Sequence, residues 1–151
     1  MDGESAEAAL EQQRTDIRDL ARELQTATEQ AVSGSTLTAR GRWEGCDSAF
    51  NDVFRNFRYT ATVRMDAVAP GSGDLLAPLS GVAQEAGLTE EASDDPAKLR
   101  ASREGLTVSF WQLPEATPEG DLLISVYGEC IDVAEDDREE WTKRRETDPE
   151  L

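Results

Sequence analysis

Residues 57–66 alternate strictly between apolar and polar side chains. The apolar parity consists of Phe57, Tyr59, Ala61, Val63 and Met65. A period of two is typical of a β-strand with one buried face and one wet face. Such a strand needs a second layer of structure, and we expect a helix to cover its apolar face.

Two segments show the apolar spacing of a helix. Residues 6–32 contain no Pro or Gly and carry a narrow, Ala-rich apolar stripe, and a second helix ends at Gly87. Further strands are expected at 37–46, 105–113 and 121–133. The order α-β-β-α-β-β predicts an α+β fold, a two-layer sandwich in which a four-stranded antiparallel sheet carries its helices on one face.

Charge and composition divide the 151 residues into three parts. Residues 1–35 carry eight acids and three bases and form the expected N-terminal helix, as a membrane-proximal stalk or a first layer. Residues 36–133 form the α+β core, with a polar loop around 94–96. Residues 134–151 are expected to be an acidic, partly disordered tail, in which Trp141 is the only large anchor.

The formal net charge of −17 bears on the choice of partner. Nucleic acid is not expected as a partner, because neutralising phosphates requires clustered Lys and Arg in a favourable field. The segment 37–66 is the one counterweight, with five Arg against four acids.

The chain contains no histidine and two cysteines. Without histidine, the usual general base near neutral pH and the commonest zinc ligand are both missing, and Ser-His-Asp and Cys-His catalysis are excluded. Cys46 and Cys130 are 84 positions apart and match no CxxC spacing. Two interpretations remain: a long-range disulfide in an exported protein, which is favoured, or two unrelated buried thiols.

Four segments carry a resemblance to a known group of proteins. They are GRWEGCDS around Cys46, FRYTATVRMD after it, the Ala/Leu-rich helix that ends in AGL, and ISVYGEC around Cys130. Together, over residues 37–133, they resemble small uncharacterised lipoproteins of actinobacteria. The resemblance implies a bridged Cys46–Cys130 pair, an envelope location and a lipid-anchored N-terminus. It implies no activity.

The sequence contains neither a signal peptide nor a lipid-accepting cysteine. We expect Met1 to stand just after such a cysteine, so that the chain is the mature extracytoplasmic domain of a membrane-anchored lipoprotein. Contact with the membrane is then expected only through the lipid anchor. The alternative is a cytoplasmic location.

Three aromatic residues, Trp43, Trp111 and Tyr127, are candidates for an exposed binding patch, since such residues are enriched at binding hot spots. Trp111 has the parity opposite to Val108 and Phe110, so we expect it to point away from the helix-covered face. The plainer interpretation is that all three pack in the core or within the sheet.

Arginines of the alternating strand are the other candidates. Arg58 and Arg64 project from its wet face, where Arg40 and Arg42 of the preceding strand would join them. Together they would form a basic patch for an anionic cell-wall polymer or an acidic partner. The plainer role is cross-strand pairing with acids.

The leading functional hypothesis is a non-enzymatic exported lipoprotein domain that binds a protein partner or envelope ligand through an open sheet face. The alternative is a cytoplasmic acidic inhibitor or immunity-type protein, and the third is a carboxylate-dependent hydrolase. No catalytic residue, metal or cofactor is assigned. The acids at 132–137 lack the glycine of an EF-hand loop, and the thirty-two acids of the chain show no spacing that selects a catalytic pair.

Overall fold

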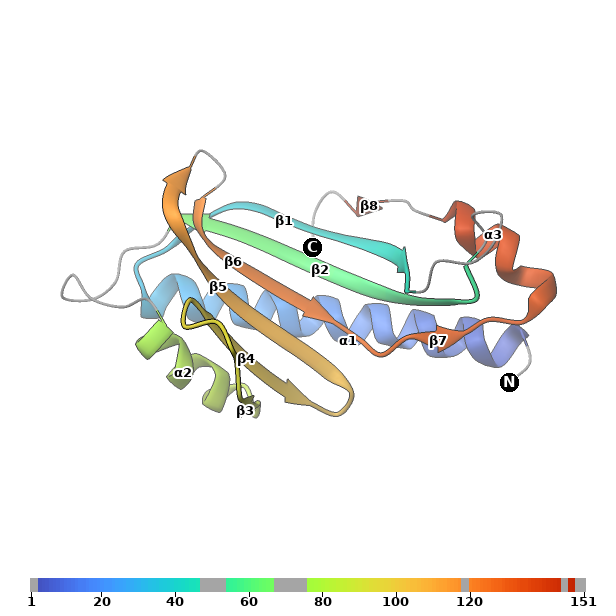
Figure 1. Cartoon of the computed structure of the whole chain (residues 1–151), viewed down its shortest axis with the longest axis horizontal. Coiled ribbons are helices and arrows are strands. Elements are labelled where there is room, and N and C mark those ends of the chain that lie inside the picture. The colour runs from blue at the N-terminus through green and yellow to red at the C-terminus, as the bar shows by residue number, and fades with distance from the viewer. Residues whose placement is uncertain (1–2, 47–53, 67–75, 118–119, 145–146, 149–151) are drawn as a thin grey trace.

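An antiparallel sheet forms one layer of the molecule, and helices form the other (Figure 1). The structure is a computed structural model, and it describes residues 3–46, 54–66, 76–117, 120–144 and 147–148. The helical elements are α1 (Gly3–Ala31), α2 (Leu76–Glu85), the 3-10 turn η3 (Glu135–Asp137) and α3 (Arg138–Lys143). The strands are β1 (Ser35–Gly45), β2 (Asn56–Asp66), β3 (Thr89–Glu91), β4 (Lys98–Arg103), β5 (Leu106–Thr117), β6 (Gly120–Tyr127), β7 (Ile131–Asp132) and β8 (Thr147–Asp148). The strands follow the order β3-β4-β5-β6-β2-β1-β8, and β7 pairs with β2.

Strand β2 lies inside the sheet and confirms the alternation. Its apolar side chains are buried against the helices, while most of its polar side chains are half-buried on the other side of the sheet. The neighbouring strands keep the same parity, since Val126 of β6 lies opposite both Ala61 of β2 and Val108 of β5. The core therefore lies on one side of the sheet, and the α+β class with an antiparallel sheet is confirmed.

Two helices cover this apolar side. α1 crosses β2 and β6 and buries Leu10, Ile17 and Leu24 completely, while α2 packs beside it over β3, β4 and β5 through Leu79. The narrow stripe of α1 leaves most of its polar residues exposed, as its spacing predicts. No helix in the described part of the chain combines the length and the apolarity that crossing a bilayer requires.

The prediction of four strands is wrong. The segment taken as a polar loop around 94–96 is flanked by β3 and β4, which extend the sheet beyond β5. All three residues of β3 are exposed, so this edge strand lacks the alternation of apolar and polar residues from which a strand is predicted. The element order also departs from α-β-β-α-β-β, since β3 and β4 precede β5, and β7, η3, α3 and β8 follow β6.

The expected strand 121–133 is divided in two by a side chain of α1. Gln13 Nε2 donates to the carbonyl of Glu129 at 2.8 Å, and Gln13 Oε1 accepts from the amide of Tyr59 at 2.7 Å. A Cβ at Gly128 would lie 2.2 Å from Gln13 Cδ, so glycine leaves the room that this side chain occupies. β6 therefore ends before Gly128, and β7 resumes the pairing with β2.

The C-terminal helix packs against the core through its tryptophan. Trp141 is only 3% exposed and contacts Trp43 edge-to-face, with ring centroids 5.1 Å apart. Its ring also lies 6.0 Å from that of Phe57. Arg144, just after α3, lies over the Trp141 ring and pairs with Glu7 of α1 at 3.8 Å. α3 is thereby held at the N-terminal end of α1.

Gly81 lies in the interior of α2, and a Cβ built there meets no atom within 4 Å. Because glycine is less favourable than alanine inside a helix, we expect Gly81→Ala to raise the free energy of unfolding by about 0.5–1 kcal/mol. Chemical denaturation of the two proteins measures the difference. A loss of stability would show that this position is crowded.

Candidate binding surface

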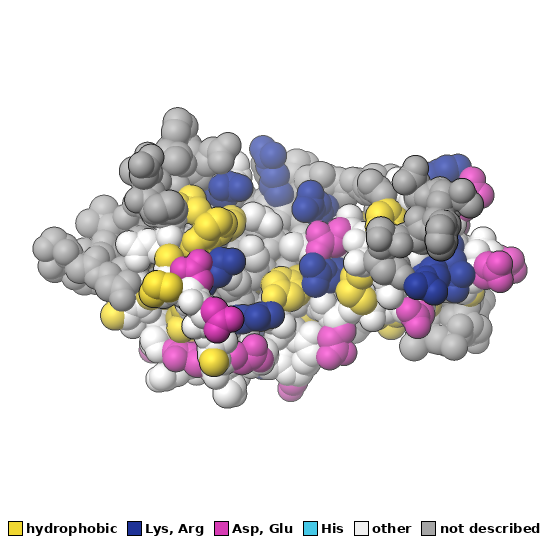
Figure 2. Space-filling view, viewed as in Figure 1, with side chains coloured by type: hydrophobic (Ala, Val, Ile, Leu, Met, Phe, Trp, Pro, Cys, Tyr) yellow, Lys and Arg dark blue, Asp and Glu magenta, His cyan; other side chains and the backbone are white. Residues whose placement is uncertain are grey.

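The side of the sheet opposite the helices is the candidate binding surface, and we call it the open face. Strand register places the following side chains on it: Thr38, Arg40, Arg42 and Glu44 of β1; Arg58, Thr60, Thr62, Arg64 and Asp66 of β2; Leu123, Ser125 and Tyr127 of β6; Thr107, Ser109 and Trp111 of β5; Lys98, Arg100 and Ser102 of β4; and Thr89 and Glu91 of β3. Figure 2 looks onto this face and shows Lys and Arg side chains gathered over the strands.

Among the strand positions of the open face whose side chains the structure describes, cations outnumber acids. Six are cationic, Arg40, Arg42, Arg58, Arg64, Lys98 and Arg100, and three are acidic, Glu44, Asp66 and Glu91. Asp94 and Asp95, in the segment before β4, add two acids beside Lys98 and Arg100. Helix α1, on the other side of the sheet, carries seven acids and three arginines. With a net charge of −17 on the whole chain, the cations of the open face form a local exception.

Arg58 and Tyr127, two of the predicted binding residues, are in contact on this face. The Arg58 guanidinium lies 4.6 Å from the centroid of the Tyr127 ring, and its Nε donates to Glu44 at 2.6 Å. Arg100 of β4 approaches the same tyrosine from the other side and donates to its hydroxyl at 3.3 Å. Tyr127 therefore joins two guanidinium groups from opposite halves of the sheet.

Trp111 also lies on the open face, as its parity predicts. Phe110 beside it is fully buried on the helix side, whereas Trp111 is half-buried and has the Lys98 ammonium 4.9 Å from its ring centroid. Arg64 lies in the same cross-strand row, separated from Trp111 by Leu123. The structure thus brings Arg58, Arg64, Trp111 and Tyr127 to one face, as the pair Arg58–Tyr127 and the row of Arg64 and Trp111. The prediction that Trp43 belongs to this patch is wrong, because Trp43 is buried on the helix side with Tyr59.

Between these two groups runs a row of small hydroxylated side chains. Thr62, Ser125 and Ser109 lie side by side across β2, β6 and β5, and the row ends at Arg40 on β1 and at Arg100 on β4. Four strand spacings separate the two arginines, or roughly 19 Å along the sheet. The larger residues Leu123 and Tyr127 stand on either side of this row, so the middle of the face has a polar floor.

Each end of this row opens into a hollow. The hollow over β1 and β2 has a volume of about 290 Å³ and is lined by Arg40, Gly41, Arg42, Thr60, Thr62 and Arg64. The hollow over β4, β5 and β6 has a volume of about 350 Å³ and is lined by Ala92, Ser93, Asp94, Asp95, Lys98, Arg100, Ser109 and Tyr127. The first contains only cationic and neutral side chains, while the second mixes both signs of charge.

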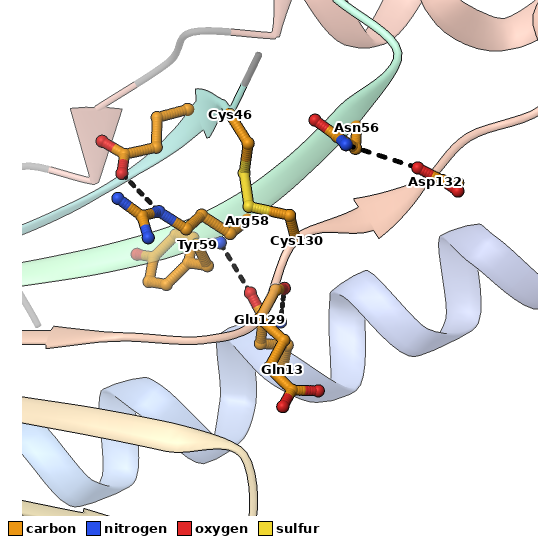
Figure 3. Close-up of a disulfide and its surroundings, with 9 residues drawn as sticks. Gln13, Cys46, Asn56, Arg58, Tyr59, Glu129, Cys130 and Asp132 are labelled. Atoms are coloured by element: carbon orange, nitrogen blue, oxygen red, sulfur yellow. Dashed lines mark hydrogen bonds and ion pairs between the residues drawn. A yellow bond between two sulfur atoms is a disulfide. The ribbon is translucent and has the colours of Figure 1, made fainter.

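Cys46 and Cys130 form a disulfide, which confirms the favoured interpretation of the cysteine pair (Figure 3). Their Cα atoms are 6.2 Å apart, and the bridge joins the segment after β1 to the segment between β6 and β7. The bridge holds these segments together at the end of β2, where Asn56 accepts from the Cys46 amide at 3.1 Å. A disulfide of this kind indicates an oxidising, extracytoplasmic setting.

Sequence reasoning missed Lys98 and Arg100, because their segment was taken as loop. A short alternation in the sequence could have indicated this strand, since the polar residues Lys98, Arg100 and Ser102 alternate with Leu99 and Ala101.

No family model, curated protein or solved structure matches this chain. The open face is therefore the basis on which a function can be proposed.

Proposed function

We propose that this protein is a non-enzymatic, exported binding domain whose open face holds an anionic protein partner or envelope ligand. The observation that carries the proposal is the gathering of six cations with Trp111 and Tyr127 on the one sheet face that no described helix covers. Arginine and aromatic side chains are the residues enriched at binding hot spots.

The acids of α1 do not cancel this attraction. At physiological ionic strength the Debye length is about 8 Å, so charges beyond that distance are largely screened. The acids exposed on α1 stand on the far side of that helix, roughly 10 Å from the sheet. A ligand seated over β1 and β2 therefore senses mainly the guanidinium groups there, whereas Asp94 and Asp95 offset the cations over β4.

The disulfide supports the exported part of this proposal, because such bonds persist in oxidising compartments. It weighs against the cytoplasmic acidic inhibitor, which would keep both thiols reduced. Attachment to the membrane through a lipidated N-terminus stays part of the proposal on the resemblance to actinobacterial lipoproteins.

Charge reversal on the open face is the test. The protein is immobilised, and an envelope fraction is passed over it. We expect the double variant Arg42→Glu/Arg100→Glu to bind its ligand about tenfold more weakly, or more weakly still, because each change removes a charged contact worth about 1.5 kcal/mol. The matched control is Arg22→Glu with Lys143→Glu, which makes the same charge change at exposed helix positions, where the side chains are 50% and 75% exposed.

Calorimetric titration with soluble envelope fragments measures the affinities, and circular dichroism checks that both double variants are folded. Equal losses in the two variants would show a nonspecific charge effect. Absence of binding to wild-type protein in both assays would remove the proposal.

A further inference from the structure

The hollow over β1 and β2 contains only hydrogen-bond donors and hydroxyls among its side chains. Arg40 and Arg42 reach it from β1, and Arg64, Thr60 and Thr62 line it from β2. No carboxylate belongs to this lining as far as the described residues define it. The other hollow includes Asp94 and Asp95, so the β1–β2 hollow is the one suited to an anion.

At least two of these cations are available for a ligand. Arg42 lies 3.5 Å from Glu44, but the other oxygen of that carboxylate is bonded to Arg58 at 2.6 Å, and the Arg42 side chain is 64% exposed. Arg40 is exposed, and within the described part of the chain no carboxylate lies at ion-pair distance from it. Neither guanidinium is therefore fully paired.

The floor of the hollow adds an unsatisfied hydroxyl. Thr60 Oγ1 is buried and finds no hydrogen-bond partner in the structure as described. A buried polar atom without a partner is unfavourable by about 1–3 kcal/mol. An acceptor in the hollow would satisfy it after a rotation of the Thr60 side chain toward the hollow, so this hydroxyl is compatible with an anionic ligand.

The frame around the hollow is fixed by pairing and packing. Arg40 lies opposite Thr62, and Arg42 lies opposite Thr60, in the antiparallel register of β1 and β2. Beneath them, Gly41 allows the Tyr59 side chain to pack directly against the backbone of β1, since a Cβ there would lie 1.9 Å from the tyrosine hydroxyl. The donors therefore stand on a rigid platform.

We propose that this hollow is an oxyanion site for the phosphodiester group of an envelope ligand, an inference that rests on the proposed function. A single planar carboxylate is satisfied by one bidentate arginine. A tetrahedral phosphodiester directs its two unesterified oxygens apart and accepts from donors on both strands. The rest of the ligand would continue over the hydroxylated row of Thr62, Ser125 and Ser109.

The test is a titration with glycerophosphoglycerol, a soluble phosphodiester, followed by amide chemical shifts and by calorimetry. We expect shifts at Arg40, Arg42, Thr60 and Thr62, and about tenfold weaker binding in Arg40→Gln. Arg22→Gln removes an exposed cation of α1, away from the open face, and should change the affinity less than twofold.

Two further probes identify the source and the chemistry of the ligand. Retention on phosphatidylglycerol vesicles that is lost in Arg40→Gln would assign the phosphodiester to a lipid headgroup, whereas binding of the soluble diester alone would assign it to a polymer. If glutarate binds as tightly as the diester, the inference is overturned in favour of carboxylates. It is also overturned if the diester does not bind, or if Arg40→Gln leaves diester binding unchanged. Continued sensitivity of envelope binding to Arg42→Glu with Arg100→Glu would then leave the proposed function standing.

Discussion

Replacement of Cys46 and Cys130 by serine will lower the free energy of unfolding by about 4 kcal/mol. The bridge closes a loop across a sequence separation of 84, and removing it restores conformational entropy to the unfolded chain. In the folded state it also fixes the segment between β6 and β7 beside the end of β1. We expect the midpoint of thermal unfolding to fall by roughly 10 °C.

Urea denaturation measures this effect. It compares the wild-type protein, with and without reductant, with the Cys46→Ser/Cys130→Ser variant. Reduced wild-type protein should unfold close to the variant, because both lack the crosslink. An unchanged midpoint in both would show that the bridge does not constrain the unfolded chain. Intact-mass alkylation without reductant should modify neither cysteine.

Gly41→Ala will destabilise the protein by about 3 kcal/mol, the upper end of the usual effect of overpacking. The added Cβ would lie 1.9 Å from the Tyr59 hydroxyl and 2.5 Å from Cζ of the same ring. Tyr59 is fully buried and held edge-to-face by Trp43 at 5.1 Å, so the ring has no room to retreat. Either β1 must shift away from β2 or the tyrosine must leave its site.

Gly81→Ala provides the matched control, since it makes the same chemical change where no neighbour stands within 4 Å. The two variants should move the urea midpoint in opposite directions. Similar effects in both would mean that backbone preference, rather than contact with Tyr59, governs position 41.

The elements with strong periodicity are the ones that sequence predicts well. The helix expected at 6–32 is α1, and the expected strands at 37–46 and 57–66 are β1 and β2, with ends that differ by no more than three residues. In each of these segments, burial of one face imposes a repeating apolar pattern. Local spacing therefore carries enough information to place them.

The elements that sequence missed depend on tertiary contacts. β3 has only exposed residues and pairs along the sheet edge, so its place is fixed by hydrogen bonds to β4. The division between β6 and β7 follows from Gln13, more than one hundred positions away. α3 lies in a highly acidic segment, and its burial depends on the contact of Trp141 with Trp43. None of these causes appears in the local pattern.

Part of the candidate site could be predicted from the sequence. Parity alone placed Trp111, Arg58 and Arg64 on the uncovered side of the sheet. Their grouping required the strand order, which brings β6 between β2 and β5 and sets Tyr127 between Arg58 and Arg100. Strand order is set by long-range pairing, and the period of a single strand does not report it.

Ligand binding to the open face can be followed directly through the tryptophans. Trp43 and Trp141 are 8% and 3% exposed on the helix side, whereas Trp111 is half-buried on the open face. We would follow the three indole N–H signals in nitrogen-15 spectra while adding soluble envelope fragments. We expect the Trp111 signal to shift and the other two to stay in place. Binding that moves Trp141 while leaving Trp111 unchanged would show that the ligand binds elsewhere than the open face.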